Sequence, residues 1–180
     1  MKKCLSIAIM LAALAAVASA TTVRPASVER LSQLASVVIE ARATRSWTEW
    51  NAQHTAIYTY TEFQVARALK GQPGQTVVVR QRGGEKDGLR QVLFGVRHFQ
   101  PGEDAVLFLQ PAENASGALQ VVDLMQGNFR VSRTTSGAAS VSNGVPGVKE
   151  LSDNGQLRTY TGMRMTLQEL ETRVRKAVTK

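Results

Sequence analysis

The chain has 180 residues, of which 43% are hydrophobic, and it carries a formal net charge of +8. Its only cysteine, Cys4, lies next to the basic N-terminal residues, so a chain without this segment could form no disulfide, thiolate metal site or cysteine nucleophile. The remaining length suits one domain with a substantial apolar core.

Residues 1–20 match the pattern of a secretory signal peptide. Lys2 and Lys3 form a basic start, the run from Leu5 to Val17 is apolar apart from one serine, and residues 18–20 (Ala-Ser-Ala) form a cleavage site. The apolar run is too short to cross a bilayer, which needs roughly 20 such residues. We therefore predict export to the periplasm or the extracellular space, and one mature domain over residues 21–180 without a transmembrane segment.

The signal peptide carries two lysines and no acid, so the mature chain would have a net charge of +6. A basic exported protein meets anionic envelope polymers or lipid headgroups rather than chromosomal nucleic acid. The alternative is that the excess charge only keeps the surface soluble.

The first predicted elements of the mature chain are a short helix and a strand. Ser27 can cap a helix whose apolar residues at positions 28, 31 and 34 or 35 share one face. The β-branched run at residues 37–39 predicts a strand that continues towards Trp47. Residues 46–55 have the composition of a loop or of the twisted end of a hairpin.

The clearest periodicity runs from Thr55 to Leu69. Apolar and small residues at positions 57, 59, 61 and 63 alternate with Tyr58 and Tyr60 and with polar residues. Strict alternation over this length predicts a long strand with one face on the core. The tyrosines would then lie on the other face, and a turn at residues 70–74 would lead to a second strand at residues 76–80.

The C-terminal half contains several shorter segments. Residues 89–95 predict a short strand, and the apolar run 105–109 predicts a central strand buried on both faces. Segments 118–124 and 128–132 are predicted to pair as a hairpin. Residues 133–156 are rich in small and polar residues, which favours a flexible surface loop.

Residues 166–179 predict a C-terminal helix. Thr166 and Glu169 match the capping box, in which each side chain accepts a hydrogen bond from a free amide of the first turn. The apolar stripe of this helix consists of Leu167, Leu170, Val174 and Val178. We expect the stripe to pack on the β domain. Alternatively, with its basic neighbours, it could lie on an anionic membrane surface.

Short strands, regular turn signals and two flanking helices predict a mainly β fold, either a small barrel or a sandwich. Strands and helices do not alternate, which disfavours a doubly wound parallel sheet.

No motif specifies a chemistry. The chain has no nucleophile-elbow, zinc-protease or phosphate-loop motif, and we predict no catalytic residue, metal or cofactor. Its only histidines are His54 and His98. A mixed metal site with Glu49 or Asp104 stays open, as does a hydrolase of an envelope polymer in which one histidine is the general base.

The best candidate for a binding surface is the aromatic set Trp47, Trp50, Tyr58 and Tyr60. Tryptophan and tyrosine supply a large contact area together with a polar group, and both are enriched at interfaces. Trp47 could equally close the core of a small barrel.

Three regions resemble exported bacterial proteins of the netrin/tissue-inhibitor-of-metalloprotease-like type. They are "LASVVIE" (residues 34–40), "YTYTEFQVARALKG" (58–71), and "GEDAVLFL" (102–109) with the later "QGNFRV" (126–131). The resemblance covers most of residues 34–131 and implies an OB-like five-stranded barrel with added helices. It does not imply protease inhibition, because the animal inhibitors bind the protease zinc through an N-terminal cysteine, and here Thr21 would be the mature N-terminus.

The fold hypothesis is therefore a small OB-like closed barrel of five to seven antiparallel strands, with an N-terminal and a C-terminal helix. The functional hypothesis is a non-catalytic exported binding module whose partner is a protein, such as a co-exported protease, or an envelope glycan. OB-like barrels bind along one face and its loops, which places the site near Trp47–Tyr60. The alternatives are the hydrolase and a module that attaches to the anionic envelope surface.

Overall fold

The computed structural model describes residues 22–115, 117–152 and 154–179. The signal peptide predicted at residues 1–20 lies outside the described residues. Two helices occur where the sequence indicated them, α2 (Val28–Leu34) and α3 (Leu167–Val178). Within the described ranges, neither is long and apolar enough to cross a membrane.

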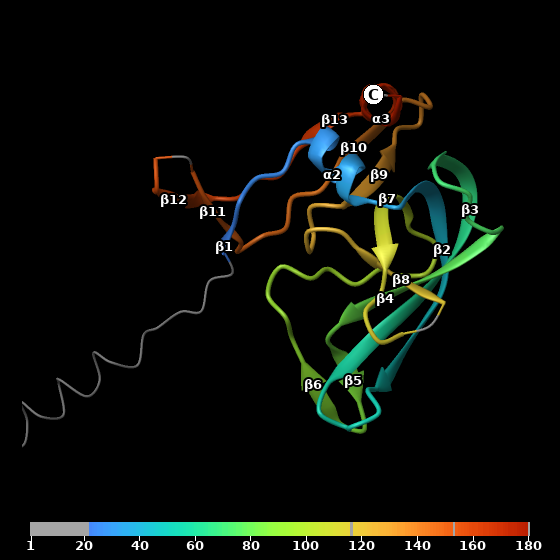
Figure 1. The fold of residues 1–180 in the computed structure, drawn as a ribbon, viewed down its shortest axis with the longest axis vertical. Helices are drawn as coiled ribbons and strands as arrows, with labels where there is room; N and C mark the ends of the chain where they lie inside the picture. Colours follow the sequence, from blue (N-terminus) through green and yellow to red (C-terminus); the bar gives the residue numbers. More distant parts are fainter. Residues whose placement is uncertain (1–21, 116, 153, 180) are drawn as a thin grey trace, which may run out of the picture.

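The fold is mainly β, as the sequence predicted (Figure 1). The strands are β1 (Thr22–Val23), β2 (Val37–Trp50), β3 (Ile57–Lys70), β4 (Thr76–Arg82), β5 (Gly84–Lys86), β6 (Leu89–Gln91), β7 (Asp104–Pro111), β8 (Ala118–Val121), β9 (Asn128–Arg133), β10 (Ala139–Ser142), β11 (Lys149–Leu151), β12 (Leu157–Thr159) and β13 (Arg164–Thr166).

The largest sheet has eight strands in the order β13-β10-β9-β7-β2-β3-β4-β8, and β8 also pairs with β7. Consequently, hydrogen-bonded pairs connect β2, β3, β4, β8 and β7 in this order, and β7 pairs with β2 again. All these pairs are antiparallel except β4–β8, which is parallel and short. The strands β9, β10 and β13 continue the sheet beyond β7.

The predicted hairpin between segments 118–124 and 128–132 is wrong. Strand β8 pairs with residues 109–111 of β7, whereas β9 pairs with residues 105–107 of the same strand. The two segments follow one another along a single edge of β7, so they cannot face each other. The backbone between them turns inward, and the Phe108 amide donates to the Gly127 carbonyl at 2.8 Å.

The segment 133–156, for which we expected a flexible loop, contains the strands β10 and β11. Strand β10 pairs with both β9 and β13, and Val141 is buried in the core under α3. Strand β11 pairs with β1 and β12 in a separate three-stranded sheet. Because these strands are only three or four residues long and rich in small side chains, they leave almost no alternation in the sequence.

Strand β7 separates two apolar cores and is buried on both faces, as predicted. Its side chains at positions 106 and 108 belong to a cluster that includes residues of α2, α3, β9 and β10. Those at positions 105, 107 and 109 belong to a second cluster, among residues of β2, β3 and β4. Three residues of the predicted stripe of α3, Leu167, Leu170 and Val174, are buried in the first cluster, whereas Val178 is exposed.

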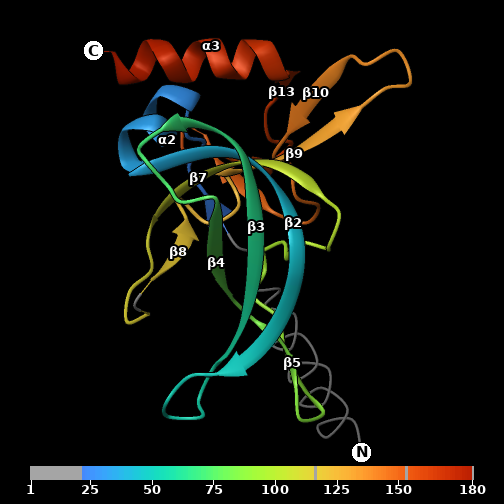
Figure 2. The same cartoon turned by 90° about the vertical axis from the view of Figure 1, so that its right-hand side faces the viewer.

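Strands β2 and β3 form a long curved arm that extends from the helical end of the molecule to a turn at its opposite end (Figure 2). Residues 46–55, expected as a loop or hairpin end, are strand as far as Trp50, and only residues 51–56 form the connection. Register irregularities along β2 let the arm bend. The small β5–β6 hairpin covers the inner side of its end, where the Thr48 hydroxyl donates to the Glu85 carbonyl at 2.6 Å.

Gly84 allows this close approach of β5 to the arm. A Cβ atom at this position would lie 2.6 Å from the Thr59 hydroxyl and 2.8 Å from a Thr48 methyl carbon, and its φ of +138° disfavours other residues. The Gly83-Gly84 pair in the sequence is therefore a packing requirement of the arm.

Candidate functional site

The register of β2, β3 and β4 gathers aromatic and basic side chains on the outer side of the arm. Trp47 lies opposite Tyr60, which in turn lies opposite Arg80, and Tyr58 lies opposite Arg82. Residues that oppose one another across a sheet project to the same side. We call the set Arg45, Trp47, Tyr58, Tyr60, Arg80 and Arg82 the aromatic–arginine face.

The rings of this face are ordered by stacking. Trp47 and Tyr60 stack with centroids 5.6 Å apart and planes inclined by 14°. The Arg45 guanidinium lies 4.8 Å from the centroid of Trp47, and that of Arg80 lies 4.3 Å from the centroid of Tyr58. Contacts of this kind hold a cation over a ring while leaving its N–H donors able to bind an anion.

Trp50, the fourth predicted site residue, lies off the aromatic–arginine face but at the rim of a cavity that Tyr58 and Tyr60 also line. It is opposite the buried Ile57, so it projects to the inner side of the arm. Its Nε1 donates to the Asp87 carboxylate at 2.8 Å, and its ring stacks on His54. The structure therefore stacks Trp47 on Tyr60 on the outer face and brings Trp50 to one cavity with Tyr58 and Tyr60, while Trp50 also ties the arm to the β5–β6 turn.

The charges of the face are divided between its two edges. On the β2 side, Arg45 pairs with Glu62 at 3.2 Å, and Glu49 accepts a hydrogen bond from Trp47 Nε1 at 2.9 Å. On the β4 side, Arg80 donates to the backbone carbonyl of Glu113. Within the described residues, no ion pair involves Arg80 or Arg82. The β4 edge is therefore a cationic surface next to the tyrosines.

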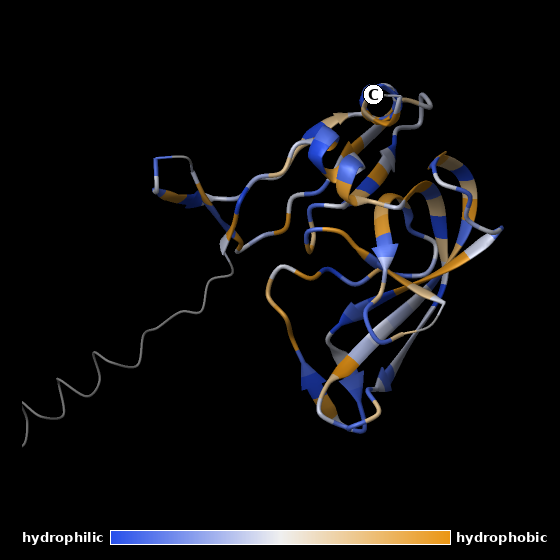
Figure 3. Ribbon diagram, in the orientation of Figure 1, coloured by the Kyte–Doolittle hydropathy of each residue, from blue (hydrophilic) through white to orange (hydrophobic). Residues whose placement is uncertain are grey.

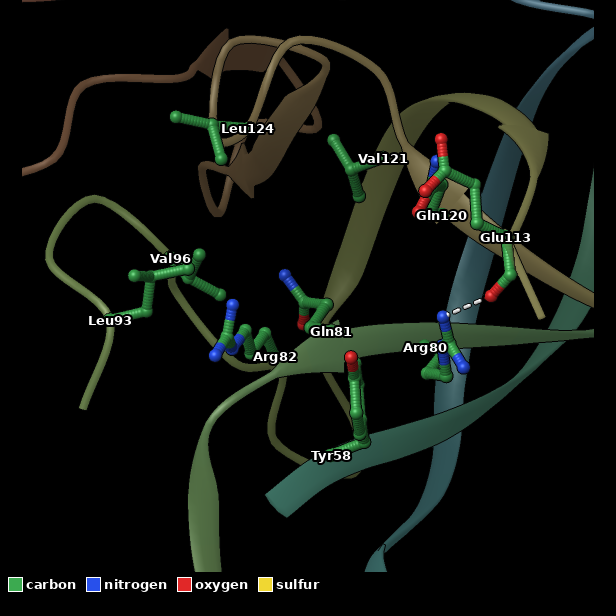
Figure 4. Close-up of a pocket in the computed structure, with 10 residues that line it drawn as sticks. All are labelled: Tyr58, Arg80, Gln81, Arg82, Leu93, Val96, Glu113, Gln120, Val121 and Leu124. Atoms are coloured by element: carbon green, nitrogen blue, oxygen red, sulfur yellow. Dashed lines mark hydrogen bonds between the residues drawn. The ribbon is translucent and has the colours of Figure 1, made fainter. Parts of the chain in front are cut away.

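Two cavities adjoin the face at this edge. The larger, of about 550 Å³, lies between the 51–56 connection and the loop after β7, and its lining includes Asn51, Tyr60 and Asn114. The smaller, of about 260 Å³, lies between β4 and β8 (Figure 4). Tyr58, Arg80 and Glu113 line both cavities. A concave site with aromatic walls and convergent polar groups is the usual form of a ligand site.

The histidines do not lie on this face. His54 stacks on Trp50 in the connection between β2 and β3, and His98 Nε2 lies 3.2 Å from the Arg82 carbonyl oxygen. The side chain of Asp104 pairs with Arg42 at 3.0 Å. In the part of the chain that the structure describes, no group of three or more His, Cys, Asp or Glu side chains is arranged to hold a metal ion.

Sequence reasoning missed the arginines as members of the site. Val77 and Val79 are buried, so the alternation in β4 already directs Arg80 and Arg82 to the outer side. Glu113 and Asn114 gave no comparable signal, because a loop residue reaches the site only through the way the strands pair.

No model of a known protein family matches the chain, and no curated protein sequence matches it. Its function must therefore be inferred from the fold and from the geometry of this face.

Proposed function

We propose that the protein is an exported, non-catalytic binding module on an OB-like closed barrel of the netrin/tissue-inhibitor-of-metalloprotease-like type. The return of the pairing from β8 through β7 to β2 supports this fold, because a five-stranded OB-like barrel needs such a closure. Counted along the chain, β3 and β4 are then the second and third strands of the barrel.

In OB folds, the face of the second and third strands binds ligands together with the loops after the first and fourth strands. Here those strands carry Tyr58, Tyr60, Arg80 and Arg82. The two corresponding loops are the 51–56 connection and the loop after β7, and both line the larger cavity. This correspondence supports the aromatic–arginine face as the ligand site.

We further propose that the ligand is an anionic envelope glycan. Flat aromatic rings offer apolar contact to the C–H faces of sugar rings, while their polar groups and nearby amides can bind sugar hydroxyls. Arg80 and Arg82 lack carboxylate partners among the described residues, so they are available to sugar carboxylates or phosphates. The observation that carries the proposal is Arg80 beside Tyr58 and Tyr60 in a cavity of about 550 Å³ that Glu113 also lines, with Arg82 next to it on β4.

Calorimetric titration of the mature protein with uronic-acid oligosaccharides tests this function. Neutral oligosaccharides of equal length serve as the comparison. The chain has two tryptophans, Trp47 and Trp50, and both lie on the arm, so tryptophan fluorescence gives a second readout. We expect the anionic series to bind and the neutral series to bind more weakly. Tyr60→Ala should lower the affinity by about tenfold, the upper end of what one aromatic contact contributes.

The matched control is Leu157→Ala. Leu157 is exposed on β12, in the separate three-stranded sheet that Figure 1 shows away from the arm, so this variant should bind as the unmodified protein does. The proposal fails if neither series binds, or if Tyr60→Ala and Leu157→Ala have the same affinity. Capture of a co-exported protease that depends on Tyr60, without any glycan binding, would assign the face to a protein partner instead.

A further inference from the structure

The smaller cavity exists because β4 and β8 pair over a short distance. Their parallel ladder joins Val78 to Ala118 and Val79 to Leu119, and it includes no residue beyond these. From Arg80 onward the two strands separate, and the space between them is the cavity of about 260 Å³ in Figure 4. Its wall is completed by the loop between β6 and β7 and by the turn between β8 and β9.

The lining of this cavity is divided by polarity. One part is polar and contains the Arg80 guanidinium, which Tyr58 and the Glu113 carbonyl hold in place; Figure 4 draws the exposed Arg82 on the other side, with Leu93 and Val96. The other part is apolar and is formed by Leu93, Val96, Val121 and Leu124. Figure 4 shows Leu93, Val96 and Leu124 on one side of the cavity, with Arg80 and Glu113 on the opposite side.

Gln81 also belongs to the lining, but its side-chain oxygen is buried. Its residue is 8% exposed, and its Nε2 donates to the Arg97 carbonyl at 2.9 Å. Its Oε1 has no hydrogen-bond partner among the described residues. Because this oxygen has almost no accessible surface, a ligand in the cavity cannot reach it, and the charged contacts that the cavity offers come from Arg80 and Arg82.

The apolar part continues onto the surface through the loop between β6 and β7. Val92 and Phe94 in this loop are 61% and 63% exposed, and Leu93 between them lines the cavity. Figure 3 shows this hydrophobic stretch along the outside of the molecule. Large side chains that are exposed next to one another mark interaction surfaces more often than isolated ones do.

Leu124 adds a second, independent sign of function. It lies in the left-handed region with a φ of 56°, next to Asp123 with a φ of 53°, and its side chain is 43% exposed. Turn positions with positive φ favour glycine or asparagine, and a branched residue there is strained. Leu124 is strained and its side chain is exposed at the cavity, so it contributes little to the stability of the fold. This agrees with a role in binding.

We propose that this cavity binds an anionic amphiphile. The charged head group contacts Arg80 and Arg82, and the aliphatic chain lies along Leu93 and Leu124 towards the exposed loop. A free fatty-acid-like molecule and a lipid held in a bilayer share this chemistry. The two proposals share Arg80 and Arg82, but the apolar wall lies outside the aromatic–arginine face, so substitutions in that wall test this inference separately.

Calorimetric titration with decanoate below its micelle concentration, and with decanol below its solubility limit, tests the free form. Co-sedimentation with phosphatidylcholine vesicles, with and without phosphatidylglycerol, tests the bilayer form. We expect decanol to bind at least about tenfold more weakly than decanoate, because it lacks the charge. Binding to anionic vesicles alone would assign the ligand to a bilayer, and binding of free decanoate alone would assign it to a soluble amphiphile.

Two variants and a control locate the site. Leu93→Asn should weaken binding by about tenfold through loss of apolar contact. Leu124→Gly should also weaken binding, yet it should raise the melting temperature, because glycine adopts this φ without strain. The control is Leu157→Asn, because Leu157 is as exposed as Phe94 but lies outside the cavity. This variant should change neither the affinity for the amphiphile nor the affinity for the glycan.

The proposal is overturned if no amphiphile or anionic vesicle binds, or if Leu93→Asn and Leu124→Gly bind as tightly as the Leu157→Asn control. Failure of the glycan proposal has a different signature. In that case Leu93→Asn and Leu124→Gly still reduce amphiphile binding, while Tyr60→Ala has no effect on any oligosaccharide.

Discussion

The helical end of the molecule and the arm at the opposite end use the same residue types in different ways. Under α2 and α3, arginines are neutralised by carboxylates: Arg67 contacts both Glu40 and Glu171, Arg133 contacts Glu40 at 2.8 Å, and Arg173 forms two hydrogen bonds to Glu29 at 2.8 Å. On the aromatic–arginine face, Arg45 and Arg80 lie over aromatic rings, and within the described residues Arg80 and Arg82 have no carboxylate partner.

This difference separates stability from binding. Burying apolar side chains and pairing charges lowers the free energy of the folded state but leaves little for a ligand to contact. Half-exposed rings and unpaired cations contribute less to folding and stay available for association. We therefore expect substitutions at the helical end to change stability and substitutions on the arm to change binding.

Among the substitutions that test this comparison, Leu170→Ala at the helical end should have the largest effect on stability. Leu170 is fully buried between α3 and the sheet, in the cluster that contains Phe108 and Val141. Its truncation should lower the free energy of unfolding by about 2–5 kcal/mol, through lost apolar burial and the cavity left behind. Arg82→Ala, on the aromatic–arginine face, should change the free energy of unfolding by no more than about 0.5 kcal/mol. Urea denaturation of both variants measures these changes. Equal losses in the free energy of unfolding would show that this face stabilises the fold as much as the helices do.

An intermediate effect is expected from Arg67→Met. This substitution leaves Glu171, which is buried, with only Arg175 at 4.0 Å. The free energy of unfolding should fall by about 1–3 kcal/mol, the cost of leaving a buried polar group without its main partner. Arg42→Met breaks the exposed pair with Asp104 and should cost about 0–1 kcal/mol.

Chemical denaturation at neutral pH measures both arginine variants. A further substitution of Glu171→Gln in the Arg67→Met background should recover part of the lost stability, because a neutral amide is less costly to bury than a carboxylate. If Arg67→Met and Arg42→Met lower the free energy of unfolding equally, the ion pairs of Arg67 under α3 stabilise the fold no more than an exposed ion pair does.

The smallest effect is a pH dependence at the contact between the two helices. The two hydrogen bonds from Arg173 lower the pKa of Glu29 from its ordinary value of 4.5 to about 2. A carboxylate whose pKa is lowered by folding stabilises the protein above its unfolded pKa, and this stabilisation is lost as the pH falls through the folded pKa. The contribution of Glu29 is therefore complete near neutral pH and disappears between 4.5 and about 2.

Melting temperatures of the unmodified protein and of Glu29→Gln, measured across this acid range, isolate the contribution. The unmodified protein should be the more stable near neutral pH, and the two should converge as Glu29 becomes protonated. A difference that stays constant down to the lowest pH would mean that the Arg173 contact does not depend on the charge of Glu29.

Local patterns in the sequence predicted the features that depend on neighbouring residues. Thr166 caps α3 by accepting a hydrogen bond from the Glu169 amide at 3.1 Å, and Ser27 caps α2 in the same way through the Arg30 amide at 3.2 Å. The apolar run of β7 marked a strand between two cores, and the alternation in β3 directed Tyr58 and Tyr60 to its outer side. Each of these features follows from the geometry of a single helix or strand.

Only the tertiary structure decided which segments lie side by side. That β8 and β9 share one edge of β7, that β4 and β8 run parallel and separate after Val79, and that Trp50 reaches Asp87 are results of pairing between distant segments. A strand's periodicity fixes which face each side chain takes but not which edge it will join, because any free edge offers the same backbone donors and acceptors. The sequence therefore determined the two faces of each strand, and the packing of the whole chain determined the cavities between them.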